Sequence, residues 1–235
     1  SGIHLCVNLT RDESQWTDLP IDKCQALHLM KHGLAALCIE QRGLGQRTEL
    51  LQPSEGQKGC PTAALQGFML GRTLIGERIF DVDRGIDYLA ARGDINISRI
   101  GIQGMSSGGT TALFAAAVLP RIAFAWPQSY FCTFEHSIMA MKHCMCNYVP
   151  HLMEWAEMPD ILGLFAPRPV VIVTGNTDSI FPIKGVRKAF RQLKRIYSAA
   201  GALHNCRLIV RPGGHELFLE EAWPAVKKAI SLVAP

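Results

Sequence analysis

Short apolar runs alternate with longer amphipathic segments from about residue 21 to the end of this 235-residue chain. Each short run ends at glycine, proline or a polar turn residue, which is typical of buried parallel strands. We predict strands at residues 34–39, 100–103, 122–126, 170–174 and 207–211, and helices at 21–32, 77–91, 108–119, 184–200 and 219–233. This rhythm predicts an α/β fold with a mostly parallel sheet and helices on both faces.

The composition limits the class of protein. Hydrophobic residues make up 48% and charged residues 19% of the chain, which excludes disorder and fibrous repeats. The length suits one α/β domain, so we expect a single domain over residues 1–235. The longest apolar stretch, residues 112–119, is far shorter than the roughly 20 residues of a membrane span, so we expect no transmembrane helix.

The charge and the cysteine content limit which binding partners, disulfides and metal ions we expect. A net charge of +4 is too small and too dispersed to indicate nucleic acid or an anionic membrane. We expect the 8 cysteines to be free, mostly buried thiols, because a chain of this size builds a core without disulfides. For the localisation, we favour the cytoplasm. His143, Cys144 and Cys146 lack the spacing and the second pair of a zinc site, so we expect no metal. The sequence contains no phosphate loop or dinucleotide fingerprint.

Two stretches interrupt the strand–helix rhythm. Residues 43–76 and 127–168 are too long for ordinary connections and are rich in glycine, proline, cysteine and aromatic residues. In open α/β sheets, ligands bind at the carboxyl edge, so we expect both stretches to form pocket walls there, with 127–168 as a cap or pocket insertion.

The strongest chemical signal is the pentapeptide Gly104-Met105-Ser106-Ser107-Gly108, which follows a predicted strand and precedes a helix of small residues. A serine in this setting is typical of a nucleophile elbow. The turn favours glycines because the strained serine backbone brings neighbouring segments too close for a Cβ atom. We predict that Ser106 is the nucleophile and that the Ser107 N–H, at a helix N-terminus, helps to form an oxyanion hole.

A serine hydroxyl is a weak nucleophile unless a histidine accepts its proton and a carboxylate orients that histidine. Asp178 and His215 each lie in a loop just past a predicted strand, so both can meet Ser106 at one sheet edge. The chain order Ser106, Asp178, His215 is that of the α/β-hydrolase fold. The competing groups without this placement are Asp160, Glu216, Glu220, His136, His143, His151 and His204. For these histidines we expect core or surface roles.

Several segments together resemble the acetyl xylan esterase-like and dienelactone hydrolase-like members of the α/β-hydrolase superfamily. Besides the elbow and the Asp178 and His215 loops, these segments are residues 40–45, 70–78, 146–150 and 166–169. The resemblance implies an α/β-hydrolase fold and a serine carboxylesterase without a cofactor. The implied substrates are small-molecule esters, such as acetyl groups on sugars.

Such relatives carry two or three strands and a His-Gly type oxyanion loop ahead of the region that resembles residues 1–9. This sequence has neither, so the resemblance implies an N-terminally truncated fold with an unassigned second oxyanion donor. The absent strand lies beside the nucleophile strand in the superfamily, so we expect residues 3–9 or a second copy, as a homodimer, to fill the gap. Two alternatives stay open, a serine peptidase of the prolyl-oligopeptidase type and a non-catalytic binding protein of this fold.

Overall fold

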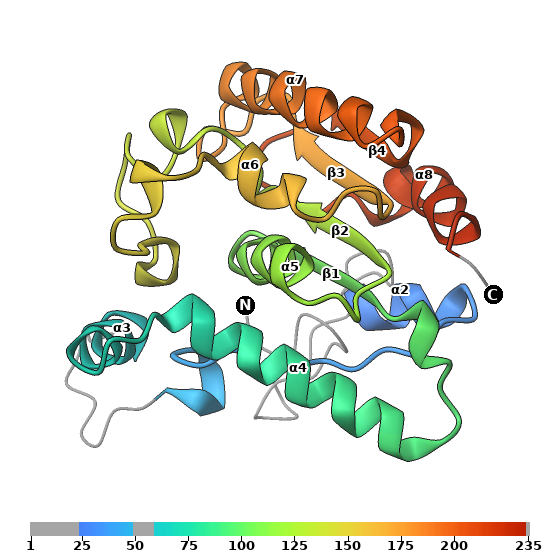
Figure 1. The fold of residues 1–235 in the computed structure, drawn as a ribbon, viewed down its shortest axis with the longest axis horizontal. Coiled ribbons are helices and arrows are strands. Elements are labelled where there is room, and N and C mark those ends of the chain that lie inside the picture. The colour runs from blue at the N-terminus through green and yellow to red at the C-terminus, as the bar shows by residue number, and fades with distance from the viewer. Residues whose placement is uncertain (1–23, 49–58, 234–235) are drawn as a thin grey trace, which may run out of the picture.

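The computed structural model describes residues 24–48 and 59–233. Four strands form one sheet in the order β1-β2-β3-β4, namely β1 (Gly101–Met105), β2 (Phe124–Gln128), β3 (Val170–Gly175) and β4 (Cys206–Arg211). All three pairings are parallel, so every connection crosses over the sheet and all four strands point the same way (Figure 1). Four of the five predicted strands are thereby confirmed.

Helices cover both faces of the sheet, as expected. The larger core lies under α4 (Leu74–Arg92), α5 (Ser107–Val118), α6 (Met158–Gly163) and α7 (Ile183–Ala199). The smaller core lies under α8 (Leu219–Ser231), and Leu29 of α2 (Gln25–Lys31) packs against it. In β3, Val170 and Ile172 enter the first core while Val171 and Val173 enter the second, because successive strand side chains point to opposite faces.

The two interrupting stretches contain short helices that the sequence did not reveal. The first holds η3 (Gly45–Arg47) and α3 (Gly59–Met69), and the second holds η5 (Phe134–His136), η6 (Met145–Asn147), η7 (Leu152–Glu154) and α6. Two further turns, η4 (Ile97–Arg99) and η8 (Leu203–Asn205), precede β1 and β4. Helix α6 begins with a reciprocal cap between Glu157 and Asp160. It has only 6 residues, so its apolar pattern is too short to detect in the sequence.

Arg168 explains one of the segments that carry the resemblance. Its guanidinium donates to the carbonyls of Leu119 and Ile122 at 2.9 and 2.7 Å, and to Ala116 O at 3.2 Å. These acceptors lie at and just past the end of α5, where helix carbonyls lack intrahelical partners. The segment 166–169 therefore stabilises the helix that begins directly after Ser106.

The predicted strand at 34–39 is wrong in the described structure. This segment runs alongside α4, where a Cβ atom on Gly85 would lie 2.9 Å from Ile39 Cδ1, and it pairs with no strand among residues 24–48 and 59–233. A cavity of about 1070 Å³ separates it from β1. An extended segment cannot form a strand without a neighbour to exchange hydrogen bonds, so β1 is an edge strand of the described sheet. Residues 3–9 lie outside the described part of the chain.

Among the helices that the structure describes, none combines the length and apolar character needed to cross a bilayer.

Candidate active site

Ser106 occupies the turn between β1 and α5 with φ 53° and ψ −116°, a left-handed backbone that is rare for serine. A Cβ atom on Gly104 would overlap the carbonyl of Gly108, and one on Gly109 would lie 2.6 Å from Tyr130 Cβ. Gly108 itself has room, since its nearest neighbour would be Gln41 Nε2 at 3.8 Å. The tight turn therefore depends on Gly104 and Gly109, which corrects the expectation that both glycines of the pentapeptide are sterically required.

Asp178 and His215 meet as a hydrogen-bonded pair. Asp178 is 3% exposed, and its Oδ1 accepts from the backbone N–H groups of Ile180 and Phe181 at 2.8 and 3.0 Å. Its Oδ2 lies 2.9 Å from His215 Nδ1. The carboxylate is thus fixed by its own loop and can orient the imidazole with Nδ1 protonated, which leaves Nε2 as a base. The Phe181 ring stacks on the His215 ring at a centroid distance of 5.8 Å.

The end of β2 connects the Ser106 turn to the His215 loop. The Ser106 N–H donates to Gln128 O at 3.0 Å, and the Gln128 side-chain oxygen accepts from the Phe218 N–H at 3.2 Å. The Ser129 hydroxyl donates to Glu216 O at 3.0 Å. Within the described residues no hydrogen bond joins the Ser106 hydroxyl to His215. Catalytic hydrogen bonds are often long in free enzymes and tighten when substrate binds.

The competing carboxylates are engaged elsewhere. Glu216 Oε1 accepts from the Gly214 N–H at 3.1 Å within its own loop. Asp160 caps α6 by accepting from the Glu157 N–H at 3.0 Å. Glu220 pairs with Lys31 of α2 at 2.9 Å. Asp178 is therefore the candidate in direct contact with His215.

Ser107 is held by a buried arginine that the sequence analysis did not single out. Arg78 of α4 is 1% exposed and donates from Nη1 to Ser107 Oγ at 3.1 Å and from Nη2 to Arg42 O at 2.8 Å. Burial lowers its pKa, while Cys146 and Asp81 act in the opposite direction. Arg78 lies in the segment 70–78, which carries part of the family resemblance, and this was the one feature of the sequence that pointed to it. This contact links α4 to the first turn of α5.

Two further contacts fix the same turn of α5. Thr111 Oγ1 donates to Gln41 Oε1 at 2.7 Å, and Thr110 Oγ1 donates to Asn147 Oδ1 at 3.2 Å. Gln41 and Asn147 belong to the segments 40–45 and 146–150. Three of the segments that carry the resemblance therefore converge on the helix behind Ser106, although they lie far apart in the chain.

His143 lies near the candidate triad and was expected to have only a core or surface role. Its ring packs edge-on against Phe181 at 5.6 Å, and Nε2 lies 3.3 Å from the Ser137 hydroxyl. Burial lowers its pKa, and the nearby His215 lowers it further. A neutral imidazole can donate a hydrogen bond to substrate without adding charge. His143 comes from the stretch 127–168, and the role of this stretch as a cap or pocket wall stays a prediction.

Cys60 and Cys144 form a disulfide between α3 and the stretch 127–168, so the expectation of free thiols is wrong for these two. They lie 84 residues apart, and only the fold brings them together. Cys132 and Cys206 are buried thiols, and burial raises the pKa of each to about 12. Burial also raises the pKa of Cys146, which lies beside Cys60 and Cys144. These thiols are protonated and unreactive at neutral pH.

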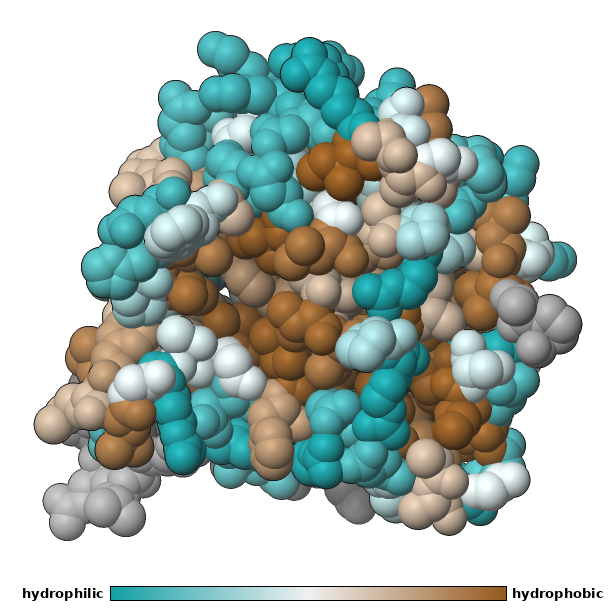
Figure 2. Space-filling view, viewed as in Figure 1, coloured by the Kyte–Doolittle hydropathy of each residue, from teal (hydrophilic) through white to brown (hydrophobic). Residues whose placement is uncertain are grey.

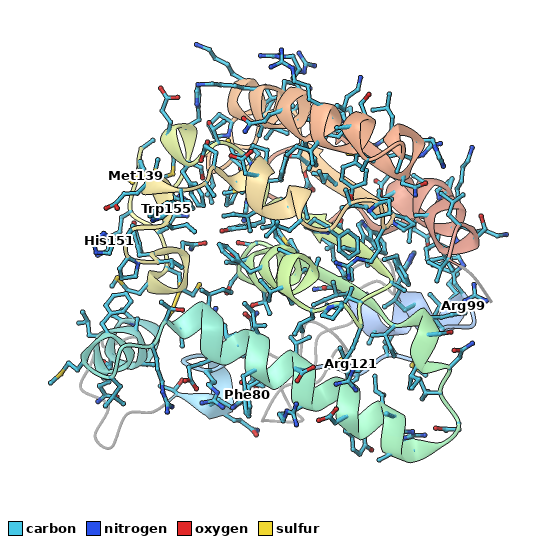
Figure 3. The ribbon with its side chains drawn as sticks, in the orientation of Figure 1. Phe80, Arg99, Arg121, Met139, His151 and Trp155 are labelled. Atoms are coloured by element: carbon cyan, nitrogen blue, oxygen red, sulfur yellow. A yellow bond between two sulfur atoms is a disulfide. The ribbon has the colours of Figure 1, made fainter. Side chains whose placement is uncertain are left out.

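Apolar side chains gather along a hollow that crosses the face shown in Figure 2, between α4 and the upper helices. Met139, His151 and Trp155 project from the outer side of the stretch 127–168 (Figure 3). Trp155 is 86% exposed and Met139 is 65% exposed. This stretch therefore offers apolar surface beyond the elements that carry the triad.

Comparisons with known proteins agree with this architecture. The sequence matches the Abhydrolase family over residues 8–206. It is 30% identical over 191 residues to a protein from Bacillus subtilis (strain 168) that is named as a hydrolase, YtaP, and this match covers 78% of the chain and 60% of YtaP.

Solved structures with the same fold include a protein from Bacteroides fragilis designated an acetyl xylan esterase, with a TM-score of 0.65 and 16% identity. That match covers 81% of this chain and 49% of the other. A family 15 glucuronoyl esterase from Caldicellulosiruptor kristjansonii has a TM-score of 0.56 and 17% identity, covering 66% of this chain and 49% of the other. The chain therefore spans about half the length of these structures.

Proposed function

The chain belongs to the Abhydrolase family and has the α/β-hydrolase fold, and from these premises we propose that it is a serine carboxylesterase acting on small acyl esters. The observation that carries the proposal is the 2.9 Å contact between Asp178 and His215, at the sheet edge where Ser106 adopts its left-handed turn. A buried carboxylate, an oriented imidazole and a serine at a helix N-terminus are the parts that acyl transfer needs.

In the acylation step, Ser106 Oγ attacks the ester carbonyl carbon as its proton passes to His215 Nε2. Asp178 keeps the Nδ1 proton in place and stabilises the imidazolium that forms. The Ser107 N–H, at the first position of α5, donates to the oxyanion, and the helix dipole adds to this stabilisation. Collapse of the tetrahedral intermediate breaks the bond to the alcohol oxygen, which takes the proton from His215 and leaves.

In the deacylation step, His215 Nε2 accepts a proton from water as the water oxygen attacks the acyl carbon on Ser106. The second tetrahedral intermediate expels Ser106 Oγ, which recovers the proton from His215. The carboxylic acid leaves and the enzyme is restored. In both steps His215 accepts the proton from the attacking oxygen and returns it to the oxygen that leaves.

The structural relatives suggest a substrate class. They are named as an acetyl xylan esterase and a glucuronoyl esterase of a carbohydrate esterase family. We therefore favour an ester of a sugar, with an acetyl-type group as the acyl part. The exposed aromatic ring of Trp155, in the stretch 127–168, is the kind of surface on which a sugar ring can stack.

Hydrolysis of p-nitrophenyl acetate, compared with that of a peptide anilide, tests the proposal. We expect ester hydrolysis that Ser106→Ala abolishes, and no amide hydrolysis. Faster cleavage of the anilide would favour a serine peptidase instead. Absence of turnover on both substrates, in protein that is shown to be folded, would favour a non-catalytic binding protein. A panel of acetylated sugars and methyl glucuronates then separates the two ester classes.

A further inference from the structure

A second cluster of chemically active side chains lies between α2 and α8 and shares no residue with the candidate triad. His28 and His32 lie one turn apart on α2 and its C-terminal cap, and Glu220 lies in the first turn of α8. One donor atom from each residue lies within 4.8 Å of the other two. Two imidazoles and a carboxylate in this arrangement are a common ligand set for zinc.

We propose that His28, His32 and Glu220 form a binding site for one divalent transition-metal ion of the zinc class, which ties α2 to α8.

The first argument is the burial of His28 without hydrogen-bond partners. Its side chain is fully buried, yet among the described residues neither ring nitrogen has a hydrogen-bond partner. His32 Nε2 is also buried and has no partner in the part of the chain that the structure describes. A buried polar atom without a partner is costly, and a bound ion is one way to satisfy it.

The second argument is the spacing of the donor atoms. His28 Nδ1 and Glu220 Oε1 are 3.5 Å apart, which is too long for a good hydrogen bond. Two ligands that each lie about 2.0 to 2.2 Å from a tetrahedral ion are about 3.3 to 3.6 Å from each other. This pair already has the separation of two ligands on one ion, and a ring nitrogen of His32 lies within 4.8 Å of both donor atoms.

The third argument is the rigidity of the surrounding rings. His32 stacks on Trp223 at a centroid distance of 3.9 Å with an interplanar angle of 16°. His28 packs edge-on against Trp223 at 5.5 Å and against Trp126 at 6.3 Å. The two tryptophan rings pack against both imidazoles and hold them beside each other before an ion binds. Glu220 is 42% exposed, so the site opens to solvent and an ion can enter.

Lys31 competes with the ion for the same carboxylate. Its ammonium donates to Glu220 Oε1 at 2.9 Å, and its side chain is 50% exposed. Surface ion pairs of this kind contribute little to stability, so a metal ion can displace the ammonium. Removing the lysine is therefore expected to strengthen metal binding, whereas removing a ligand weakens it.

The test is titration of the full chain, freed of metal, with Zn²⁺ by calorimetry and with Co²⁺ by visible absorption. We expect one ion per chain and a Co²⁺ spectrum typical of tetrahedral nitrogen and oxygen ligands. His32→Ala and Glu220→Gln, both at solvent-accessible positions, should each weaken binding at least about tenfold, and Lys31→Gln should strengthen it. The circular dichroism of every variant should match that of the parent chain.

The control is His151→Ala, which removes an exposed histidine that pairs with Glu154 at 2.7 Å outside the cluster. This variant should bind Zn²⁺ as the parent chain does. The proposal is overturned if the parent chain binds no Zn²⁺ at micromolar concentration. It is also overturned if His32→Ala and His151→Ala weaken binding equally, because the ion would then be held by scattered surface histidines. These readouts do not depend on ester hydrolysis, so the site and the proposed activity fail separately.

Discussion

Replacing Asp178 with asparagine tests the candidate triad without a change of shape. The Asp178 Oδ1 accepts two backbone N–H groups, from Ile180 and Phe181, so the asparagine oxygen is expected to take that place. The amide NH₂ then faces His215 Nδ1, which lies 2.9 Å from Oδ2 in the parent chain. Nδ1 must now accept a hydrogen bond, so the ring proton moves to Nε2. The imidazole loses the lone pair that accepts the proton from Ser106.

The size of the loss in kcat depends on the free energy needed to return His215 to the tautomer that is protonated on Nδ1. Flipping the amide leaves two buried N–H groups without acceptors, at a cost of roughly 1 to 3 kcal/mol each. The imidazolium in the transition state also loses its carboxylate partner. We expect kcat for p-nitrophenyl acetate to fall about 10³- to 10⁴-fold, or about 4 to 5.5 kcal/mol, in line with the roughly 10⁴-fold effect of the same change in serine proteases. The urea unfolding midpoint should change little.

The matched control is Asp160→Asn, which alters a carboxylate that caps α6 and makes no contact with His215. Its kcat should stay within about twofold of the parent value, since loss of a helix cap acts on stability and not on chemistry. If Asp178→Asn retains more than a tenth of the parent kcat while remaining folded, Asp178 does not orient the catalytic base. Equal losses in both variants would show that general destabilisation explains the result.

Three other predictions follow from the same structure. Ser106→Ala and His215→Ala should each lower kcat by about 10⁴- to 10⁶-fold, and residual turnover above a tenth of the parent value contradicts these roles. Burial lowers the pKa values of His28 and His143, so the unfolded chain binds more protons than the folded chain as pH falls below about 6.5. The contribution of the two neutral histidines to the free energy of unfolding is therefore complete above that pH. Below it, the free energy of unfolding should fall by up to about 1.4 kcal/mol per pH unit for each histidine. Urea denaturation between about pH 5 and 8 measures this fall, and constant stability over that range refutes it. Dialysis against a chelator should leave ester hydrolysis intact, because side chains carry each proposed step, and activity lost on chelation and restored by Zn²⁺ would contradict the mechanism.

Much of the fold could be predicted because its signals are local. The runs that became β1 to β4 are short and apolar, and Ser106 sits in a turn whose glycines, strand and helix are contiguous in sequence. Asp178 and His215 could be placed because parallel strands bring their loops to one edge. Their 2.9 Å contact agrees with that reasoning, although their catalytic roles stay predictions.

The residues that sequence reasoning missed act through contacts between distant segments. Arg78 reaches Ser107 from a different helix, and His143 approaches His215 only through the shared neighbour Phe181. The disulfide of Cys60 with Cys144 likewise depends on how α3 folds against the stretch 127–168. No spacing rule detects such pairs, because the chain between them sets no fixed distance.

The open edge of β1 leads to the last prediction. In the described structure β1 pairs with β2 alone, and its other edge faces the cavity of about 1070 Å³ beside the segment 34–39. Each buried N–H or C=O group without a partner costs roughly 1 to 3 kcal/mol, so we expect either residues 3–9 or a second copy of the chain to cover this edge. Two measurements distinguish these possibilities, namely hydrogen exchange of the backbone amides at 101–105 and the oligomeric state from sedimentation. Protection that is lost when residues 1–9 are deleted identifies the first, and protection that is lost on dilution to a monomer identifies the second. A monomer of the full chain with rapid exchange at 101–105 and full esterase activity refutes both, because an edge strand beside the nucleophile would then need no partner.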